Sequence, residues 1–236
     1  MKGRFMVIHE NRAFRQIANV ILRFLFSLLL KLEVQGTENV PAIGAFIAMI
    51  NHVSFLDPLL VVALAPREIV AMSKIENYRN PIANLVLRLY GSFPIRRGEL
   101  DMQAIRTSLH ILQQGRGLLM APEGTRSKTC TLQKGRDGMT MIALRCTNVP
   151  IVPIAISGSE QFKYNWRRLR RTPVRMVFGQ AFHFRTQEGM PHREQMRLMT
   201  CEAMYRLAAL LPPEYRGVYS DVENATMRFI VPCGPA

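Results

Sequence analysis

The chain has few cysteines and few acidic residues, and both shortages narrow what it can be. Four cysteines occur in 236 residues, and none has the paired spacing of a zinc site. Scattered thiols are typical of a reduced, cytosolic protein, so we expect neither a disulfide nor a bound metal. Only 17 Asp and Glu face 31 Lys and Arg, for a formal net charge of +14. This excess favours a polyanionic partner: nucleic acid, an anionic membrane surface or a phosphate-bearing substrate.

Targeting and linker signals are also missing. The N-terminal apolar stretch has no small-residue cleavage site after it, which argues against a secretory signal. No internal repeat or low-complexity linker divides the chain, and 48% hydrophobic with 20% charged residues is typical of a globular protein. The length fits one domain with a substantial core and at most a small appendage.

Residues 12–31 predict an amphipathic helix. Arg15, Asn19 and Arg23 begin a polar stripe that repeats at every fourth position, and Phe and Leu cover the other faces. A bilayer span would place Arg23 near mid-membrane, at a cost of roughly 2.5–3.5 kcal/mol. We therefore favour a helix lying in the membrane interface, with arginines at the headgroups and its apolar face in lipid. Packing on its own domain is the main alternative, and a span comes third.

Strand-like and helix-like segments alternate after this helix, which predicts an α/β fold. We expect strands near 45–50, 68–72, 91–95, 117–121, 149–156, 174–178 and 181–184, and helices from 58, over 81–89, between 101 and 115, over 136–146 and over 192–211. Pro150 and Pro153 predict that their strand is partly irregular or lies at a sheet edge. The expected architecture is a single domain over residues 32–217, with a mixed, mostly parallel sheet flanked by helices. The N-terminal segment 1–31 precedes it, and a C-terminal tail, 218–236, follows.

The most informative motif is Asn-His-Val-Ser-Phe-Leu-Asp at residues 51–57. His52 follows a predicted buried strand, and Asp57 precedes Pro58 at the start of the next helix, where its side chain is expected to cap free amides. The loop between them is short enough for the carboxylate to meet the imidazole ring. An imidazole oriented by a carboxylate is a general base that can deprotonate a hydroxyl.

Two more polar clusters follow predicted strands. They are Arg96-Arg97 and the segment 122–127, Pro-Glu-Gly-Thr-Arg-Ser. Ligands of open α/β sheets gather outside the carboxyl ends of the strands, and arginine can grip a phosphate through two donors. The combination of a base, its orienting acid and arginines fits a hydroxyl nucleophile carried on a phosphate ester.

Four motifs in this order resemble those of the glycerolipid acyltransferases, specifically the 1-acylglycerol-3-phosphate (lysophosphatidic acid) acyltransferase type. The similar blocks are Asn51-His52 to Asp57, residues 91–98 with Arg97 at the arginine position, residues 122–127, and the apolar residues 149–154. The resemblance covers roughly residues 32 to 217, and four ordered motifs are more specific than any single one. Arg96 departs from the family, in which its position is often acidic.

The resemblance implies transfer of a fatty acyl group from a thioester, acyl-coenzyme A or acyl carrier protein, to the free hydroxyl of lysophosphatidate, which gives phosphatidic acid. His52, oriented by Asp57, is implied as the general base, with no cofactor. The implied substrate-binding residues are Arg97, Glu123, Gly124, Thr125 and Arg126, and a wall for the acyl chain or donor is implied at Val149, Pro150, Ile151, Val152 and Pro153. The implied location is the cytoplasmic face of a membrane, as a peripheral or monotopic protein.

Three alternatives stay open. The acceptor could instead be glycerol-3-phosphate or another lysophospholipid. A Ser-His-Asp hydrolase could use Ser54, although no Gly-x-Ser-x-Gly elbow surrounds it. The basic run from Lys163 to Arg175, with Tyr164 and Trp166 interleaved, could grip nucleic acid, but no helix-turn-helix, zinc or RNA-binding signature accompanies it. We prefer an anionic membrane surface for this run and expect no nucleic-acid partner.

Overall fold

A mixed β-sheet forms the centre of the computed structural model, which describes residues 10–96, 98, 101–146 and 148–234. Within these residues the sheet has nine strands, and its main path runs β1-β7-β6-β2-β5-β3-β4. The strands are β1 (Leu30–Gln35), β2 (Phe46–Ile50), β3 (Ile69–Lys74), β4 (Phe93–Ile95), β5 (Gly117–Met120), β6 (Ile151–Ser157), β7 (Thr172–Phe178), β8 (Phe182–Phe184) and β9 (Ile230–Pro232). Neighbours from β6 to β4 are parallel, whereas β7 and β8 pair antiparallel with β6. The predicted mixed, mostly parallel sheet is confirmed.

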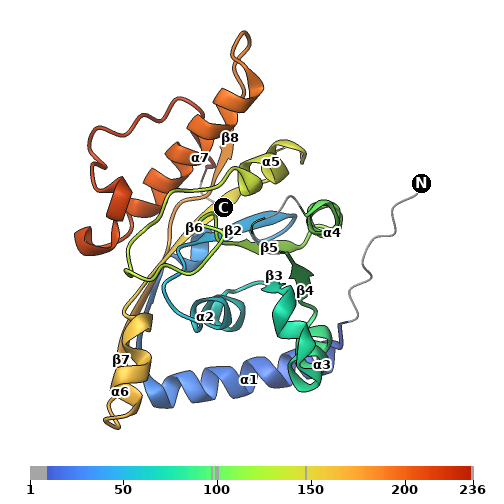
Figure 1. Ribbon diagram of the computed structural model, residues 1–236, viewed down its shortest axis with the longest axis vertical. Helices are drawn as coiled ribbons and strands as arrows, with labels where there is room; N and C mark the ends of the chain where they lie inside the picture. The colour runs from blue at the N-terminus through green and yellow to red at the C-terminus, as the bar shows by residue number, and fades with distance from the viewer. Residues whose placement is uncertain (1–9, 97, 99–100, 147, 235–236) are drawn as a thin grey trace.

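Helices cover both faces of this sheet (Figure 1). They are α1 (Arg12–Leu29), α2 (Asp57–Leu64), α3 (Pro81–Tyr90), α4 (Met102–Gln113), α5 (Gly138–Leu144), α6 (Phe162–Trp166) and α7 (His192–Ala208). In the view of Figure 1, α2 and then α1 lie below the sheet, and α5 and α7 lie above it. The short helix α6 lies beside β7, near one end of α1, and α3 lies near the other end.

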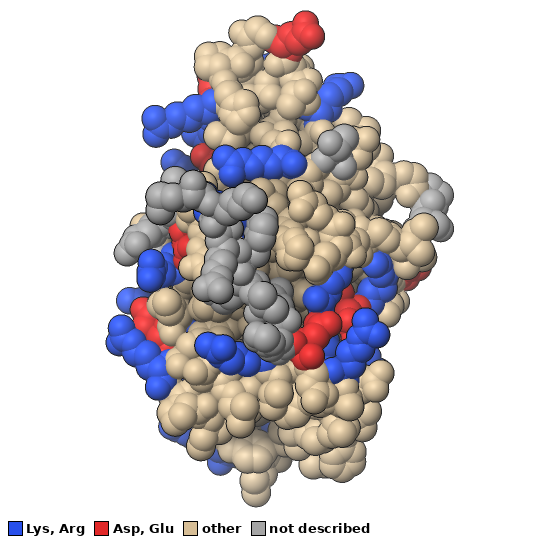
Figure 2. Space-filling view, turned by 90° about the vertical axis from the view of Figure 1, so that its right-hand side faces the viewer, with Lys and Arg blue, Asp and Glu red and all other residues tan. Residues whose placement is uncertain are grey.

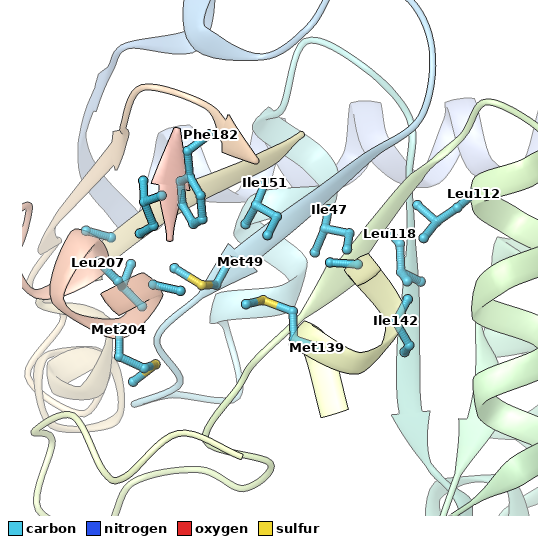
Figure 3. Packing of buried hydrophobic residues seen from close by; sticks show 14 of the residues in the cluster. Ile47, Met49, Leu112, Leu118, Met139, Ile142, Ile151, Phe182, Met204 and Leu207 are labelled. Atoms are coloured by element: carbon cyan, nitrogen blue, oxygen red, sulfur yellow. The ribbon is translucent and has the colours of Figure 1, made fainter. Parts of the chain in front are cut away.

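The core is divided between the two faces by the alternation of side chains along each strand. On β2, Ile47 and Met49 point into the cluster that α4, α5 and α7 complete (Figure 3). Phe46, Ala48 and Ile50 point to the other face, where residues of α2 and the end of α1 pack. All five β2 residues are buried, as expected of a parallel strand covered on both sides.

The expectation for the Pro150–Pro153 strand was wrong. β6 is regular from Ile151 and lies inside the sheet, between β2 and its antiparallel partners. Its pairing with β8 is at Ile151, and its pairing with β7 begins at Ile154. Pro153 falls between these two partners, where a missing backbone N–H breaks neither ladder.

The other predicted segments agree with the structure to within a few residues, but two edge strands were missed. β1 follows α1 directly and pairs parallel with β7, and β9 pairs with β8 within the stretch after residue 217. Both strands depend on partners far away in the sequence. Asp101 caps α4, since its Oδ1 accepts hydrogen bonds from the amides of Gln103 and Ala104 at 3.1 and 3.0 Å.

Helix α1 packs on the domain through its polar stripe. The side chain of Arg15 is 1% exposed, and its Nη2 donates to the carbonyl of Ile69 at 2.8 Å. Arg23 Nε donates to the carbonyl of Ala63, at the end of α2, at 2.6 Å. The expectation that these arginines reach lipid headgroups was therefore wrong. The opposite, apolar face is exposed, through Ile17, Val20, Ile21, Phe24, Leu25 and Leu28.

No helix in the described ranges has both the length and the apolar character needed to cross a bilayer. All four cysteines are free and partly buried.

Candidate active site

His52 and Asp57 meet at the carboxyl end of β2. The Nδ1 atom of His52 lies 3.0 Å from Asp57 Oδ2, and both side chains are buried. A carboxylate can only accept a hydrogen bond, so Nδ1 carries the proton in the neutral ring and Nε2 is free to accept one. This is the arrangement of an oriented general base. The predicted contact between these two side chains is confirmed.

Asp57 is held by the loop that precedes it. Its Oδ2 accepts hydrogen bonds from the backbone amides of Val53 and Ser54, both at 2.7 Å. Its Oδ1 accepts one from the hydroxyl of Ser159 at 2.6 Å. The expected capping of the following helix was therefore wrong: Asp57 is the first residue of α2, and its carboxylate binds amides on the N-terminal side. These donors stabilise the ionised carboxylate in a buried place.

Glu123 supports the main chain of His52. Its Oε1 accepts the backbone N–H of His52 at 2.9 Å, and its Oε2 accepts the backbone N–H of Gln133 at 3.0 Å. Burial raises the pKa of this carboxyl group, while hydrogen bonds from Gln133 and His52 act against the rise. The carboxylate thus joins the loop of residues 51–57 to the segment after β5, rather than presenting both oxygens to a ligand.

Asn51 and Ser127 fix the two sides of the same loop. The side chain of Asn51 bonds in both directions to the backbone of Ile156, its Nδ2 donating at 2.7 Å and its Oδ1 accepting at 2.8 Å. The amide of Ser127 donates to the carbonyl of His52 at 2.8 Å. The backbone that carries the His52 imidazole is therefore hydrogen-bonded both to β6 and to the loop after β5. These bonds hold the ring in a fixed position, as catalysis by positioning requires.

A cavity of about 200 Å³ opens beside His52. Its apolar wall comes from Ile50, Pro58, Met72, Ile95, Leu119, Met120, Ala121, Pro122 and Met139, and its polar rim includes Arg96, Gly98, Gly124, Arg136 and Gly138. The cavity lining therefore combines an imidazole, many apolar side chains and two arginines. Such a site fits a ligand with an acyl chain and an anionic group.

Gly124 is required at the rim for two reasons. Its φ is +72°, in the left-handed region that favours glycine. A Cβ at this position would lie 3.0 Å from the Cδ of Arg136, so glycine lets the arginine side chain lie over the loop. The loop that carries Glu123 thus also shapes the anion-binding side of the cavity.

The other residues implied by the resemblance lie in different places. Arg97 is outside the described residues. Thr125 and Arg126 are exposed on the loop after β5 and are not among the described residues that line the cavity. The cavity lining also lacks the five residues of the implied acyl wall, Val149, Pro150, Ile151, Val152 and Pro153. The last three are buried within β6, where Ile151 and Val152 belong to the core on opposite faces of the sheet. The apolar wall of this cavity comes instead from the residues beside β3, β4, β5 and α5.

Sequence reasoning missed Ser159 and Arg136. Ser159 follows β6 and is fully buried, but it lies 102 residues from Asp57 in the sequence. Arg136 comes shortly after the third motif, and its amide donates to the carbonyl of Pro122 at 2.9 Å. The sequence offered one signal for both residues: each follows a predicted strand, and ligands of open α/β sheets bind outside the carboxyl ends of the strands.

Ser54 has a local role in the loop. Its hydroxyl accepts a hydrogen bond from the amide of Leu56 at 3.3 Å, and its side chain is buried. In the described part of the chain, no three His, Cys, Asp or Glu side chains gather in a way that could hold a metal ion.

An α/β domain with a buried His–Asp pair beside a cavity lined by two arginines has the features of an enzyme active site. Comparison with known proteins makes this specific. The sequence matches the profile of the Acyltransferase family over residues 31–157, more than half of its length. The chain belongs to this family of acyltransferases, and the resemblance drawn from the four motifs is confirmed.

Several relatives are named 1-acyl-sn-glycerol-3-phosphate acyltransferases. The protein from Bacillus subtilis is 25% identical over 76% of this chain and 87% of its own length. The one from Borreliella burgdorferi is 27% identical over 56% of this chain, and a chloroplastic one from Brassica napus is 30% identical over 55%. The matched region covers only 54% and 38% of these last two proteins.

A solved structure shares the fold. The crystal structure of the 1-acyl-sn-glycerophosphate (LPA) acyltransferase PlsC from Thermotoga maritima matches with a TM-score of 0.59 and 23% sequence identity. The match covers 79% of this chain and 75% of that one. It therefore confirms the arrangement of sheet and helices.

Proposed function

We propose that the protein transfers a fatty acyl group from a thioester donor, acyl-coenzyme A or acyl carrier protein, to the free hydroxyl of 1-acyl-glycerol-3-phosphate. The observation that carries this proposal is the His52–Asp57 hydrogen bond at the mouth of a cavity with an apolar wall and an arginine rim. The names of the relatives support the choice of acceptor.

The reaction is a direct transfer. His52 Nε2 removes the proton of the acceptor hydroxyl as its oxygen attacks the thioester carbonyl. The carbon–sulfur bond then breaks, and the sulfur leaves as a thiol after the imidazolium returns the proton. Asp57 keeps the ring aimed and stabilises its cationic form, and no acyl-enzyme forms. General base catalysis of this kind contributes typically about 10²–10⁴-fold, and fixed positions of the two substrates contribute the rest.

Binding of the acceptor divides between the two sides of the cavity. Arg96 and Arg136 at the rim hold the phosphate, since guanidinium groups bind phosphate through paired donors. Met72, Leu119 and Met139, which line the apolar part of the cavity, contact the acyl chain of the acceptor. Arg97 and Arg126 stay predictions for phosphate binding, and the donor's identity stays a choice between the two thioesters.

The second part of the proposal is that the enzyme binds a membrane through α1 and α3. Six large apolar residues of α1 are exposed, and Ile82, Leu85 and Val86 of α3 are exposed beside them. Figure 2 shows that the lower part of this side of the molecule carries mostly uncharged residues. An exposed apolar face of this extent on a soluble monomer marks an interaction surface, and a helix that lies in the bilayer interface fits it. Peripheral or monotopic attachment at the cytoplasmic face stays a prediction.

The test is an assay of the full chain in detergent with a panel of thioester donors and with acceptors that carry or lack the phosphate and the acyl chain. We expect His52→Ala to abolish transfer and Ser54→Ala to keep most of it, because Ser54 forms no covalent intermediate. The reverse pattern would identify a serine hydrolase. Equal rates with glycerol-3-phosphate would point to that acceptor instead.

A further inference from the structure

Residues 162–171 comprise α6 and the turn that leads into β7, and we call this segment the 162–171 loop. It is strongly cationic. It carries Lys163, Arg167, Arg168, Arg170 and Arg171, and the sequence has no acidic residue between Glu160 and Glu188. The guanidinium carbon of Arg168 lies 3.9 Å from the ring centre of Tyr164, so at least one arginine is arranged against an aromatic face. A surface of this charge attracts an anionic partner.

The same loop exposes large apolar side chains at its tip. Leu169 is 93% exposed, and its φ of +54° lies in the left-handed region that disfavours a branched side chain. Hydrogen bonds of 3.0 Å from the amides of Leu169 and Arg170, to Trp166 and Asn165, hold this conformation. Trp166 and Tyr164 are also more than half exposed. A strained turn that presents a leucine and a tryptophan to solvent indicates an apolar partner.

The loop lies beside the C-terminal end of α1. Arg171 Nη2 donates to the carbonyl of Ser27 at 2.7 Å, and its Nε donates to that of Leu30 at 3.1 Å, which joins the loop to the end of α1. Figure 1 shows α6 beside the end of α1, on the side of the sheet where α1 lies. A planar partner that covers α1 therefore also reaches this loop.

Aromatic contacts connect the loop with the active-site loop. The rings of Trp166 and Phe162 are stacked with centres 6.1 Å apart, and Phe162 meets Phe55 edge-on at 6.1 Å. Phe55 lies between His52 and Asp57 in the sequence and is partly exposed, and Lys163 Nζ lies 5.8 Å from the centre of its ring. Trp166 in the 162–171 loop and Phe55 in the 51–57 loop are thus connected through the ring of Phe162.

We propose that residues 162–171 are a second membrane contact, in which Trp166 and Leu169 enter the interfacial region of an anionic bilayer and the arginines bind lipid phosphates. Together with α1 it fixes which side of the enzyme faces the bilayer, and it places the catalytic loop next to the lipid. This inference deepens the proposed function and rests on it for its biological meaning. The exposed leucine favours a membrane, because the bilayer interface buries apolar side chains while the neighbouring arginines complement anionic lipids.

The experiment measures binding of the full chain to phosphatidylcholine vesicles with and without phosphatidylglycerol, in the absence of substrate. Two variants test the loop: Trp166→Ser with Leu169→Ser, and Arg168→Ala with Arg170→Ala. The matched control is Arg193→Ala with Arg197→Ala, which removes two exposed arginines from α7 on the other face of the sheet. Thermal unfolding of each variant shows whether it is folded.

We expect the loop arginine pair to weaken binding to the anionic vesicles by roughly 30-fold, from the attraction of each cation to the surface, and to leave binding to pure phosphatidylcholine unchanged. The serine pair should weaken binding to both, and the α7 pair should change neither. Unchanged vesicle binding in both loop variants would overturn the proposal. Because no substrate is present, a failure of the proposed reaction would leave this result intact.

Discussion

The hydroxyl of Ser159 donates a hydrogen bond of 2.6 Å to Asp57 Oδ1, and so joins the end of β6 to the His52–Asp57 pair. Both side chains are fully buried. The turn that carries Ser159 is itself fixed, since Tyr215 accepts a hydrogen bond from the amide of Gly158 and donates one to Glu160 Oε1. Burial, followed by this bond to Glu160, raises the pKa of Tyr215, so it stays a neutral donor.

Replacing Ser159 with alanine should lower kcat with little change in KM. Loss of a hydrogen bond to a charged group costs about 1.5–3 kcal/mol. Every increase of about 1.4 kcal/mol in the activation free energy slows the reaction about tenfold. We expect roughly a tenfold decrease, measured by steady-state kinetics. The control is Ser157→Ala, two residues earlier on β6. Equal effects of the two changes would show that Ser159 acts only through packing.

The change Glu123→Gln keeps the volume of the side chain but should destabilise the protein. The carboxylate accepts one amide on each oxygen, whereas a glutamine amide nitrogen cannot accept, so one buried N–H loses its partner at a cost of about 1–3 kcal/mol. Denaturant unfolding measures this change. If Glu123 instead served only to bind substrate, the free energy of unfolding would be unchanged and KM alone would rise.

Glu123 should also make the free energy of unfolding depend on pH, and the Glu123→Gln variant serves as the reference. Burial raises the folded-state pKa of Glu123 above its ordinary value of 4.5, so the folded protein holds this proton more tightly than the unfolded chain. The resulting contribution to stability is fully present below the ordinary value and is lost as pH rises through the folded-state pKa. The free energy of unfolding of the wild type, minus that of Glu123→Gln, should therefore decrease over this range. An increase would mean that the amide hydrogen bonds outweigh burial.

Arg136→Ala should raise KM for a phosphate-bearing acceptor. Arg136 lines the cavity that contains His52, and removal of one of two guanidinium groups weakens phosphate binding, we expect by roughly tenfold. Arg145, at the other end of α5 and also exposed, provides the control through Arg145→Ala. An acceptor that lacks the phosphate should show the same KM with the wild type and both variants. A phosphate-independent effect would contradict the assignment.

How far the sequence could predict this site depends on separation along the chain. His52 and Asp57 are five positions apart, so local geometry was enough to predict their contact. Ser159 joins them only because β6 lies next to β2 in the sheet, and no local pattern contains that neighbour. Glu123 was recognised as a motif residue, but its two amide partners follow from the packing of the loop after β5 against residue 52. A motif therefore identified the residue, whereas the fold determined what its side chain contacts.

Helix α1 shows the same limit for a surface. Its stripe of polar residues was correctly predicted, but periodicity does not say which face meets the domain. The carbonyls of Ala63, at the end of α2, and of Ile69, in β3, accept hydrogen bonds from Arg23 and Arg15, and these partners turn the polar stripe inward. The apolar face then has no partner within the described part of the domain.

Two residues of that face test its role in membrane binding. Val20 and Phe24 are both 66% exposed, and their transfer into lipid is worth about 1–2 kcal/mol each. Val20→Ser with Phe24→Ser should therefore weaken binding to uncharged vesicles by at least roughly 30-fold, measured by flotation. Val218→Ser removes a residue of similar exposure, 65%, from the segment that packs beside α7, and should have no effect. Since Arg15 and Arg23 face the domain, high salt should leave this contribution nearly intact, in contrast to that of the 162–171 loop. Equal losses in the Val218 variant would show a nonspecific effect of lower hydrophobicity and would contradict the assignment of α1 to the membrane.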